Sequence, residues 1–492
     1  MNFRAAMPFL LFLLFFAGFN CSKDNDSESN VVRSQLKLGM QEVYFSQPSE
    51  ALSWTFPDID AAKLLFDYMD DLKISRFRYT IFWTSVERSL GNFEWDRHDA
   101  LINYLTGKGI KLTVTLFGDN YLYYPDGSSP YPGHPDPGAN GFWNAWLLFV
   151  EEAVARYGDR VDRWEIWNEP DLTESGSGVF WKPLVNAADF SSMLIGTSRK
   201  IKAIQPGAKV VMGGVTNFNG YRSFLQSCFD QGVLEDIDEI GVHLYRTSPE
   251  GPFDYNRDTT VDIDSATPGI QSPATIGDEI TSLRTFVDSY RRGFPVRNTE
   301  EGFISSSRQD IAQMKYFTRM ILVEHSLGIE EVTCFRLRVP RRSDFVAGAT
   351  GDAAFTSQSL FPGIIDQTGD TTFTPRPAYY ALKNIARYLI GSNVYYERSL
   401  TLQSGVYTVR VEIYSKNGLP VIAYWIEEPI DNTLKVVRNL SFTISDIGSH
   451  AYRVINIRDN TELSAGTYTV SGNGISFSNL PATDYPFILM AD

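Results

Sequence analysis

Cysteine and histidine are scarce in this chain, with three cysteines and five histidines among 492 residues. So few cysteines make neither a disulfide framework nor a cysteine metal cluster. The histidines are scattered, without the spacing of a metal site. Cys228 and Cys334 fall in helical and strand-like segments, so we expect both to be buried free thiols. We therefore expect no metal site, and no cofactor is expected either.

Basic residues are outnumbered by acidic ones, 44 against 59, which gives a net charge of −15. Such a charge repels phosphates and argues against nucleic acid as a partner. Aromatic residues, by contrast, are abundant at 14% of the chain. Aromatic rings suit a hydrophobic core, and they also suit sugar binding, because flat rings stack on the C–H faces of pyranoses.

The apolar run near the N-terminus, residues 8–19, is too short for a comfortable membrane-spanning helix. It follows an arginine and precedes a polar acidic stretch, which predicts a secretory signal peptide over residues 1–20. Cys21 stands where a bacterial lipoprotein carries its lipid anchor, and residues 21–35 resemble an acidic tether. We expect secretion and attachment to the bacterial outer membrane or cell surface. The residues just before Cys21 depart from the usual lipoprotein pattern, so a plainly secreted protein is the alternative.

Short strand-like runs alternate with longer amphipathic stretches over residues 36–390. Eight strands alternating with helices predict an α/β fold, a (β/α)₈ TIM barrel. A doubly wound open sheet is the alternative, but no glycine-rich phosphate loop follows the first strand. The expected strands are 36–40, 74–80, 110–118, 161–169, 208–215, 237–245, 294–300 and 331–338, and two expected helices are 143–158 and 190–205.

The sequence pattern changes over residues 391–492, where short runs rich in aromatic and β-branched residues follow one another. Residues 416–418 (KNG) and 472–474 (GNG) predict tight hairpin turns. This segment is therefore expected to be a separate all-β domain, a β-sandwich. Its simplest role is structural support of the barrel. A carbohydrate-binding module is the alternative, although no sequence signal points to one.

Polar residues stand at the ends of several expected barrel strands, where barrel enzymes carry their chemistry. Asn168 and Glu169 end the fourth strand, and Glu300 and Glu301 end the seventh. Two carboxyl groups that face each other across a barrel mouth can hydrolyse a glycoside. One delivers a proton to the leaving oxygen, and the other attacks the anomeric carbon when the two stand about 5 Å apart. The other candidates for contact with a substrate are Arg78, Trp83, His243 and Tyr245.

Two of these motifs resemble those of a known group of enzymes. WEIWNEP (164–170) and NTEEG (298–302) resemble the acid/base and nucleophile motifs of clan A glycoside hydrolases, and residues 77–116 are similar to the segment from their second to third strand. The resemblance implies a retaining β-glycosidase on a (β/α)₈ barrel. The trailing β-sandwich is closest to family 39, while families 5 and 30 remain open.

The resemblance also implies roles for individual residues. Glu301 competes with Glu300, because strand alternation sends adjacent side chains to opposite faces; the clan pattern Thr-Glu-any-Gly favours Glu300. Arg78 has an alternative role as an ion-pair partner of Glu165. The implied roles are Glu169 as acid/base, Glu300 as nucleophile, Asn168 as hydrogen-bond partner of the sugar 2-hydroxyl, Arg78 and Tyr245 as donors to the nucleophile, and His243 on the floor of the site.

The eighth expected strand departs from the clan pattern. It has no tryptophan, although the clan commonly places one there beneath the sugar. It carries Phe335, Arg336 and Arg338 instead. The arginines either meet an acidic or substituted sugar or bridge to surface carboxylates, and we favour the surface position.

The sequence therefore predicts a retaining glycoside hydrolase that cleaves a β-linked oligo- or polysaccharide with two glutamates. A surface glycan-binding protein on a hydrolase-like scaffold is an alternative from another class, but such proteins often lose one of the two carboxylates. A transglycosylase that uses the same residues is a further alternative. The only membrane contact expected is the lipid anchor.

Overall fold

The computed structural model describes part of the chain. These are residues 34–42, 59–118, 120–123, 142–171, 186–216, 221–245, 249–250, 253–254, 271–272, 275–303, 309–329, 331–339, 363–367 and 372–492. The predicted signal peptide, Cys21 and nearly all of the predicted tether lie outside the described residues, so they remain predictions. No helix within the described ranges is long and apolar enough to cross a membrane.

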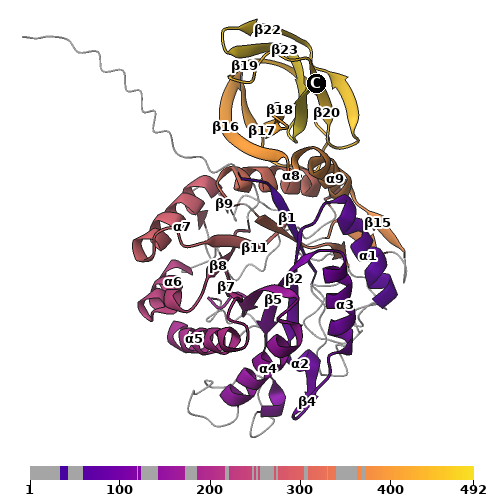
Figure 1. Ribbon diagram of the computed structural model, residues 1–492. Helices are drawn as coiled ribbons and strands as arrows, with labels where there is room; N and C mark the ends of the chain where they lie inside the picture. Colours follow the sequence, from indigo (N-terminus) through magenta and orange to yellow (C-terminus); the bar gives the residue numbers. More distant parts are fainter. Residues whose placement is uncertain are drawn as a thin grey trace, which may run out of the picture. The chain divides into compact units, whose positions relative to one another are not determined.

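Eight parallel strands close into a barrel in the order β1-β12-β11-β8-β7-β6-β5-β2, and helices ring them (Figure 1). The predicted (β/α)₈ barrel is confirmed. The strands are β1 (Lys37–Glu42), β2 (Arg76–Phe82), β5 (Lys111–Phe117), β6 (Val161–Ile166), β7 (Lys209–Thr216), β8 (Glu239–His243), β11 (Val296–Gly302) and β12 (Glu331–Phe335). The helices are α1 (Ile59–Asp71), α3 (Asp96–Gly107), α4 (Phe142–Tyr157), α5 (Ala187–Ile204), α6 (Tyr221–Asp230), α7 (Ile276–Tyr290), α8 (Asp310–Ser326) and α9 (Pro377–Leu389).

Several short helices and strands lie in the loops between the barrel strands and their helices. A one-turn helix, α2, follows β2 directly, and short β-pairs lie in several connections. They are α2 (Trp83–Val86), β3 (Glu87–Ser89), β4 (Asn92–Phe93), β9 (Phe253–Asp254), β10 (Gln271–Ser272), β13 (Arg338–Val339), β14 (Ile365–Gln367) and β15 (Phe373–Pro375), with 3₁₀ turns at Tyr121–Tyr123 and Val233–Glu235.

The C-terminal residues form antiparallel sheets, as expected for an all-β domain. One sheet has the order β16-β17-β18-β24-β20-β21 and the other β19-β23-β22. Rings from the two sheets pack together, such as Tyr424 on Phe442, with centroids 6.1 Å apart. Asn417 and Gly418 have φ of 54° and 84°, which suits the predicted hairpin turn. The strands are β16 (Val394–Ser404), β17 (Tyr407–Lys416), β18 (Leu419–Ile426), β19 (Arg438–Ser445), β20 (Tyr452–Asn456), β21 (Thr461–Ser464), β22 (Thr467–Ser471), β23 (Gly474–Ala482) and β24 (Phe487–Ala491).

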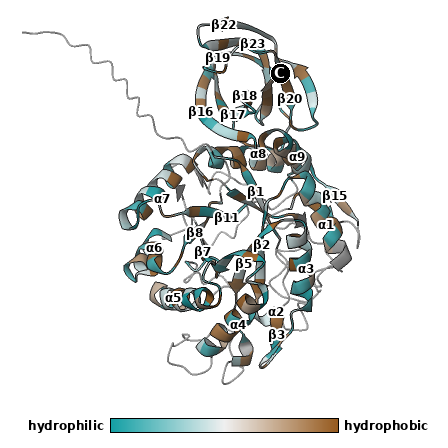
Figure 2. Ribbon diagram, in the orientation of Figure 1, coloured by the Kyte–Doolittle hydropathy of each residue, from teal (hydrophilic) through white to brown (hydrophobic). Residues whose placement is uncertain are grey.

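Helix α8 differs from the other ring helices. The ring helices carry both hydrophilic and hydrophobic residues (Figure 2), which is typical of helices with one face on a core. In α8, every residue from Ala312 to His325 is buried. The helix contacts barrel strand β12 and also β16 of the all-β domain. Its polar residues are therefore enclosed and need partners inside the protein.

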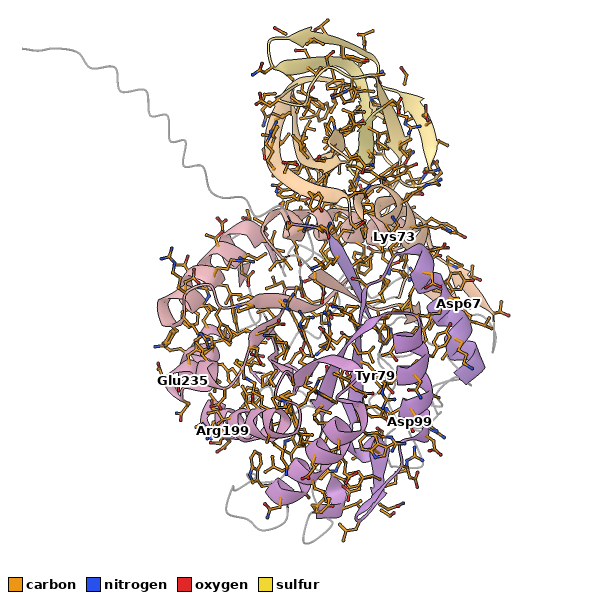
Figure 3. The ribbon with its side chains drawn as sticks, in the orientation of Figure 1. Asp67, Lys73, Tyr79, Asp99, Arg199 and Glu235 are labelled. Carbon is orange, nitrogen blue, oxygen red and sulfur yellow. The ribbon has the colours of Figure 1, made fainter. Side chains whose placement is uncertain are left out.

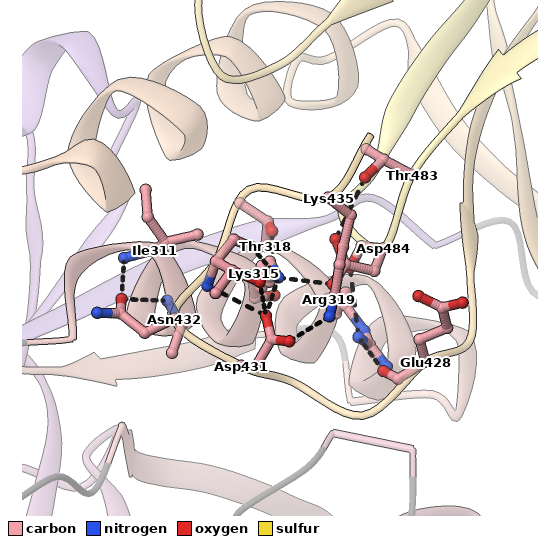
Figure 4. A network of polar contacts seen from close by, with 12 residues as sticks. Ile311, Lys315, Thr318, Arg319, Glu428, Asp431, Asn432, Lys435, Thr483 and Asp484 are labelled. Carbon is pink, nitrogen blue, oxygen red and sulfur yellow. Dashed lines mark hydrogen bonds and ion pairs between the residues drawn. The ribbon is translucent and has the colours of Figure 1, made fainter. Parts of the chain in front are cut away.

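Lys315 of α8 finds these partners in the all-β domain (Figure 4). Its ammonium group donates to Asp484 Oδ2 at 2.6 Å, to Asp431 Oδ1 at 2.9 Å and to the carbonyl of Thr433 at 2.7 Å. The side chains of Lys315 and Asp484 are both fully buried. The charge pair joins the barrel to the all-β domain.

One turn further along α8, Arg319 makes a second polar contact with this domain. It donates to Glu250 Oε1 at 2.8 Å and to the carbonyl of Glu428 at 2.8 Å. The indole of Trp425, on β18, donates to the same Glu250 oxygen at 2.9 Å. Glu250 belongs to the connection that follows barrel strand β8, so the all-β domain also holds part of a loop at the carboxyl end of the barrel.

Acid is expected to destabilise the protein through His98 of α3. Its ring nitrogens lie 2.7 Å from the hydroxyl of Tyr79 and 3.0 Å from the hydroxyl of Ser85. The side chain of Tyr79 is labelled in Figure 3. Burial lowers the pKa of His98 to about 4. The unfolded chain therefore binds a proton near pH 6.5 that the folded protein takes up only near pH 4, and stability falls as the pH falls through this window. Over the whole window the free energy of unfolding falls by about 3 kcal/mol.

Denaturant unfolding of the wild type and of His98→Gln between pH 7 and pH 4 checks this expectation. The variant lacks the titrating ring, so its unfolding free energy should fall less steeply with acid than that of the wild type. Identical slopes for the two proteins would show that His98 takes no part in the acid response.

Candidate active site

The carboxylate of Glu300 is surrounded by donors from three other barrel strands or their ends. Tyr245, just after β8, donates its hydroxyl to Oε1 at 2.6 Å. Arg78 of β2 donates Nη1 to Oε2 at 2.7 Å, and Gln41 of β1 donates its amide to the same oxygen at 3.0 Å. Both carboxylate oxygens are therefore held in fixed positions at the carboxyl end of the barrel.

This environment keeps Glu300 ionised. Burial alone would favour the neutral acid, but the charges of His243 and Arg78 and the hydrogen bonds from Tyr245 and Gln41 outweigh it and lower the pKa of Glu300. An ionised carboxylate with oriented oxygens is suited to act as a nucleophile.

Glu169 lies beyond the end of β6 and faces Glu300. Its Oε1 is 2.9 Å from Nδ1 of His243, the last residue of β8. Burial opposes protonation of His243, but the charges of Glu300 and Glu169 raise its pKa. One oxygen of Glu169 and one of Glu300 lie within 4.8 Å of each other. Glu169 and Glu300 therefore form a carboxyl pair with a separation close to the one that retaining glycosidases use, about 5 Å.

Arg78 links the two sides of this pair. Its guanidinium donates Nε to Glu165 at 2.5 Å and Nη2 to Oδ1 of Asn168 at 2.8 Å, besides its bond to Glu300. The two roles considered for Arg78, ion-pair partner of Glu165 and donor to Glu300, are thus combined in one fully buried side chain. Because the side-chain oxygen of Asn168 accepts from Arg78, the group that Asn168 can offer a ligand is its NH₂ group.

Glu301 points away from the barrel interior, as strand alternation predicts. Its carboxylate accepts from the hydroxyl of Tyr316 on α8 and from the amide of Asn298 at 3.4 Å. It is fully buried between the barrel and its helix layer. Of the two adjacent glutamates, Glu300 is therefore the one that faces Glu169.

Two expectations from the sequence are corrected. Trp83 was expected to contact substrate, but its ring is fully buried, stacks on Tyr123 and Phe149, and donates Nε1 to Glu87 at 2.6 Å. It has no surface to offer a sugar. The favoured surface position of Arg336 is also wrong, because this residue is 7% exposed. The side chain of Arg338 lies outside the described part of the chain.

Gln41 belongs to the site although the sequence did not point to it. The predicted first strand ended at residue 40, two positions before the observed end at Glu42. A glutamine near a strand end carries no chemical signature of its own. In the structure Gln41 donates to Glu300 and accepts from Arg78 at 2.8 Å. It therefore fixes the position of both partners.

The donor atoms of Glu169, His243 and Glu300 are also close enough together to hold a metal ion. Sequence spacing gives no hint of this grouping, because the three residues come from three different strand ends. The guanidinium of Arg78 contacts Glu300 directly at 2.7 Å and would repel a cation there. This positive charge disfavours a metal ion at the cluster.

A curated protein and several solved structures resemble this chain. No family model matches the chain. A curated rice protein named probable inactive beta-glucosidase 14 is 23% identical over 266 residues, or 51% of this chain and 48% of that protein. The chain thus spans about half the length of the curated relative it matches.

Solved structures resemble nearly the whole chain. A family 39 glycoside hydrolase from Bacteroides cellulosilyticus WH2 has a TM-score of 0.64 and 19% identity, covering 93% of this chain and 81% of that one. The catalytic domain of family 30 xylanase C from Talaromyces cellulolyticus has a TM-score of 0.56 and 12% identity, covering 93% and 97%. A family 30 subfamily 8 xylanase from Clostridium acetobutylicum has a TM-score of 0.55 and 14% identity, covering 94% of this chain and 97% of that one.

The chain has the fold of these glycoside hydrolases. The resemblance noted in WEIWNEP and NTEEG is therefore matched by the fold of the chain that carries them. Because one barrel fold supports many reactions, the reaction itself must be argued from the side chains of the site.

Proposed function

We propose that the protein is a retaining glycosidase that cleaves a β-linked glycan by double displacement, with Glu300 as nucleophile and Glu169 as acid/base. The observation that carries the proposal is the carboxyl pair, whose nearest oxygens lie within 4.8 Å of each other. An inverting enzyme needs a wider gap, about 6.5–9.5 Å, to admit a water molecule.

The two steps follow from this arrangement. Glu300 attacks the anomeric carbon while Glu169 gives its proton to the leaving glycosidic oxygen, which leaves a glycosyl ester on Glu300. Formation of the ester removes the negative charge of Glu300. Glu169, now a carboxylate, takes a proton from water, and the water oxygen displaces Glu300 from the anomeric carbon. Two inversions give net retention.

A panel of β-linked polysaccharides and aryl β-glycosides, incubated with the purified protein, tests the proposal. We expect cleavage, with the first-formed sugar in the β configuration by proton NMR. Glu169→Gln should lower the rate by roughly 10²- to 10⁴-fold, the usual contribution of a general acid.

Any other outcome of this experiment would contradict the proposed function or mechanism. Binding of a glycan without any cleavage would replace the proposal with a surface glycan-binding protein. Longer oligosaccharides as the main product would identify a transglycosylase. A first-formed α sugar would contradict the double displacement.

A further inference from the structure

The backbone that carries Glu169 does not continue the strand before it. β6 ends at Ile166, and Trp167 and Glu169 then have φ of 72° and 47°. This left-handed region is one that residues other than glycine rarely adopt. Such a conformation persists only where surrounding contacts hold it. The position of the Glu169 carboxyl group therefore depends on what holds residues 167–171.

The end of β7 provides the holding contacts. The amide of Glu169 donates to the carbonyl of Gly214 at 2.9 Å. Two residues on, the carboxylate of Asp171 accepts from the amide of Thr216 at 3.0 Å and from its hydroxyl at 2.7 Å. Residues 169 and 171 are thus tied to residues 214 and 216, one by its backbone and one by its side chain.

Two adjacent glycines in β7 allow this close approach. A Cβ atom on Gly213 would lie 2.3 Å from the carbonyl oxygen of Trp167, and one on Gly214 would lie 2.1 Å from Nε2 of His243. The pairing of β7 with β8 also shifts register across these glycines. The end of β7 is therefore shaped to receive both the Glu169 segment and the histidine that contacts Glu169.

We propose that Asp171 is a positioning residue for Glu169, which clamps the left-handed segment onto the end of β7 through Thr216. This inference rests on the proposed function, since it assigns to Asp171 the placement of the proton donor. Asp171 is well suited to the task because a carboxylate can accept from the amide and the hydroxyl together. Burial and the nearby charge of Glu169 raise the pKa of Asp171 to about 6, so the two carboxyl groups also interact electrostatically.

Leaving-group dependence separates a misplaced proton donor from a general loss of structure. An unactivated alkyl or phenyl glycoside needs the proton of Glu169, whereas a 2,4-dinitrophenolate leaves without it. We expect Asp171→Ala to lower kcat/KM about 100-fold on the unactivated glycoside, as a displacement of about 1 Å can do, and less than 3-fold on the dinitrophenyl glycoside. Asp171→Asn keeps one acceptor oxygen and should lie between Asp171→Ala and the wild type. Equal losses on both substrates, or none on either, would overturn the proposal.

Hydrogen exchange tests the clamp without any substrate. In the full-length protein, the Glu169 amide should exchange at least 10-fold faster in Asp171→Ala than in the wild type, because its bond to Gly214 opens more often. Thr216→Val, which removes the hydroxyl donor and keeps the amide, should give a smaller increase. Unchanged exchange in both variants would show that Asp171 holds nothing. This result is independent of whether the protein cleaves a glycan, so the clamp and the proposed function can fail separately.

Discussion

Replacing Glu300 with alanine is expected to lower kcat/KM by roughly 10⁴- to 10⁶-fold, the range found when a catalytic nucleophile or its partner is removed. The reason is that attack on the anomeric carbon requires the carboxylate that Tyr245, Arg78 and Gln41 hold in place. Steady-state hydrolysis of the best aryl glycoside from the panel measures the loss.

Glu301→Gln is the matched control for this variant. It alters the next residue of the same strand, whose side chain is directed at Tyr316 and Asn298. We expect the control to lose some stability and to keep kcat/KM within about 10-fold of the wild type. If Glu301→Gln abolished cleavage and Glu300→Ala did not, the assignment of the nucleophile would be reversed.

Added azide should rescue Glu300→Ala and Glu169→Ala in different ways. In Glu300→Ala, azide can occupy the space of the lost carboxylate and attack the anomeric carbon of the substrate, which gives an α-glycosyl azide. In Glu169→Ala, the ester on Glu300 still forms, and azide then displaces it to give a β-glycosyl azide. The configuration of each product, read by NMR, reports which face each glutamate occupies.

The barrel could be predicted from the sequence because its strands are short apolar runs between amphipathic stretches. All eight expected strands begin within two residues of the observed ones. The ends were less accurate: the fourth strand was expected to reach residue 169 but stops at Ile166, because Trp167 turns into the left-handed region. The periodicity of a sequence shows only which residues are apolar. It could not reveal this turn of the backbone, because contacts with another strand hold the turn.

The candidate site was predictable only where residue type itself carries the chemistry. Glu169 and Glu300 stood out as carboxylates at strand ends. Trp83 stood out in the same way, yet its ring turns into the packing of Tyr123 and Phe149, a direction that the sequence does not encode locally. Gln41, Asp171 and Gly214 act through close approach to neighbouring strands, which only the closed barrel brings about.

The all-β domain is expected to be part of one folding unit with the barrel, and Lys315→Met tests this expectation. The substitution removes the ammonium group from between Asp484 and Asp431 and leaves the fully buried Asp484 carboxylate without its cation. Breaking a buried pair from one side costs about 3–5 kcal/mol. Denaturant unfolding should show this loss as a lower midpoint with an unchanged slope.

The double variant Lys315→Met/Asp484→Leu separates the cost of an orphaned charge from the loss of a specific link. Removal of both charges should recover much of the stability lost in the single variant, since an apolar pair of similar volume can replace a buried ion pair. If Lys315→Met alone cost less than about 1 kcal/mol, the contact between α8 and the all-β domain would be dispensable. A substantial loss would instead show that α8, which also packs on barrel strand β12, needs the all-β domain to keep its enclosed polar side chains paired. Such a loss would mean that the all-β domain completes the burial of a barrel helix, which favours a structural role over a detachable binding module. Its contact with Glu250 through Trp425 also reaches the connection that follows β8.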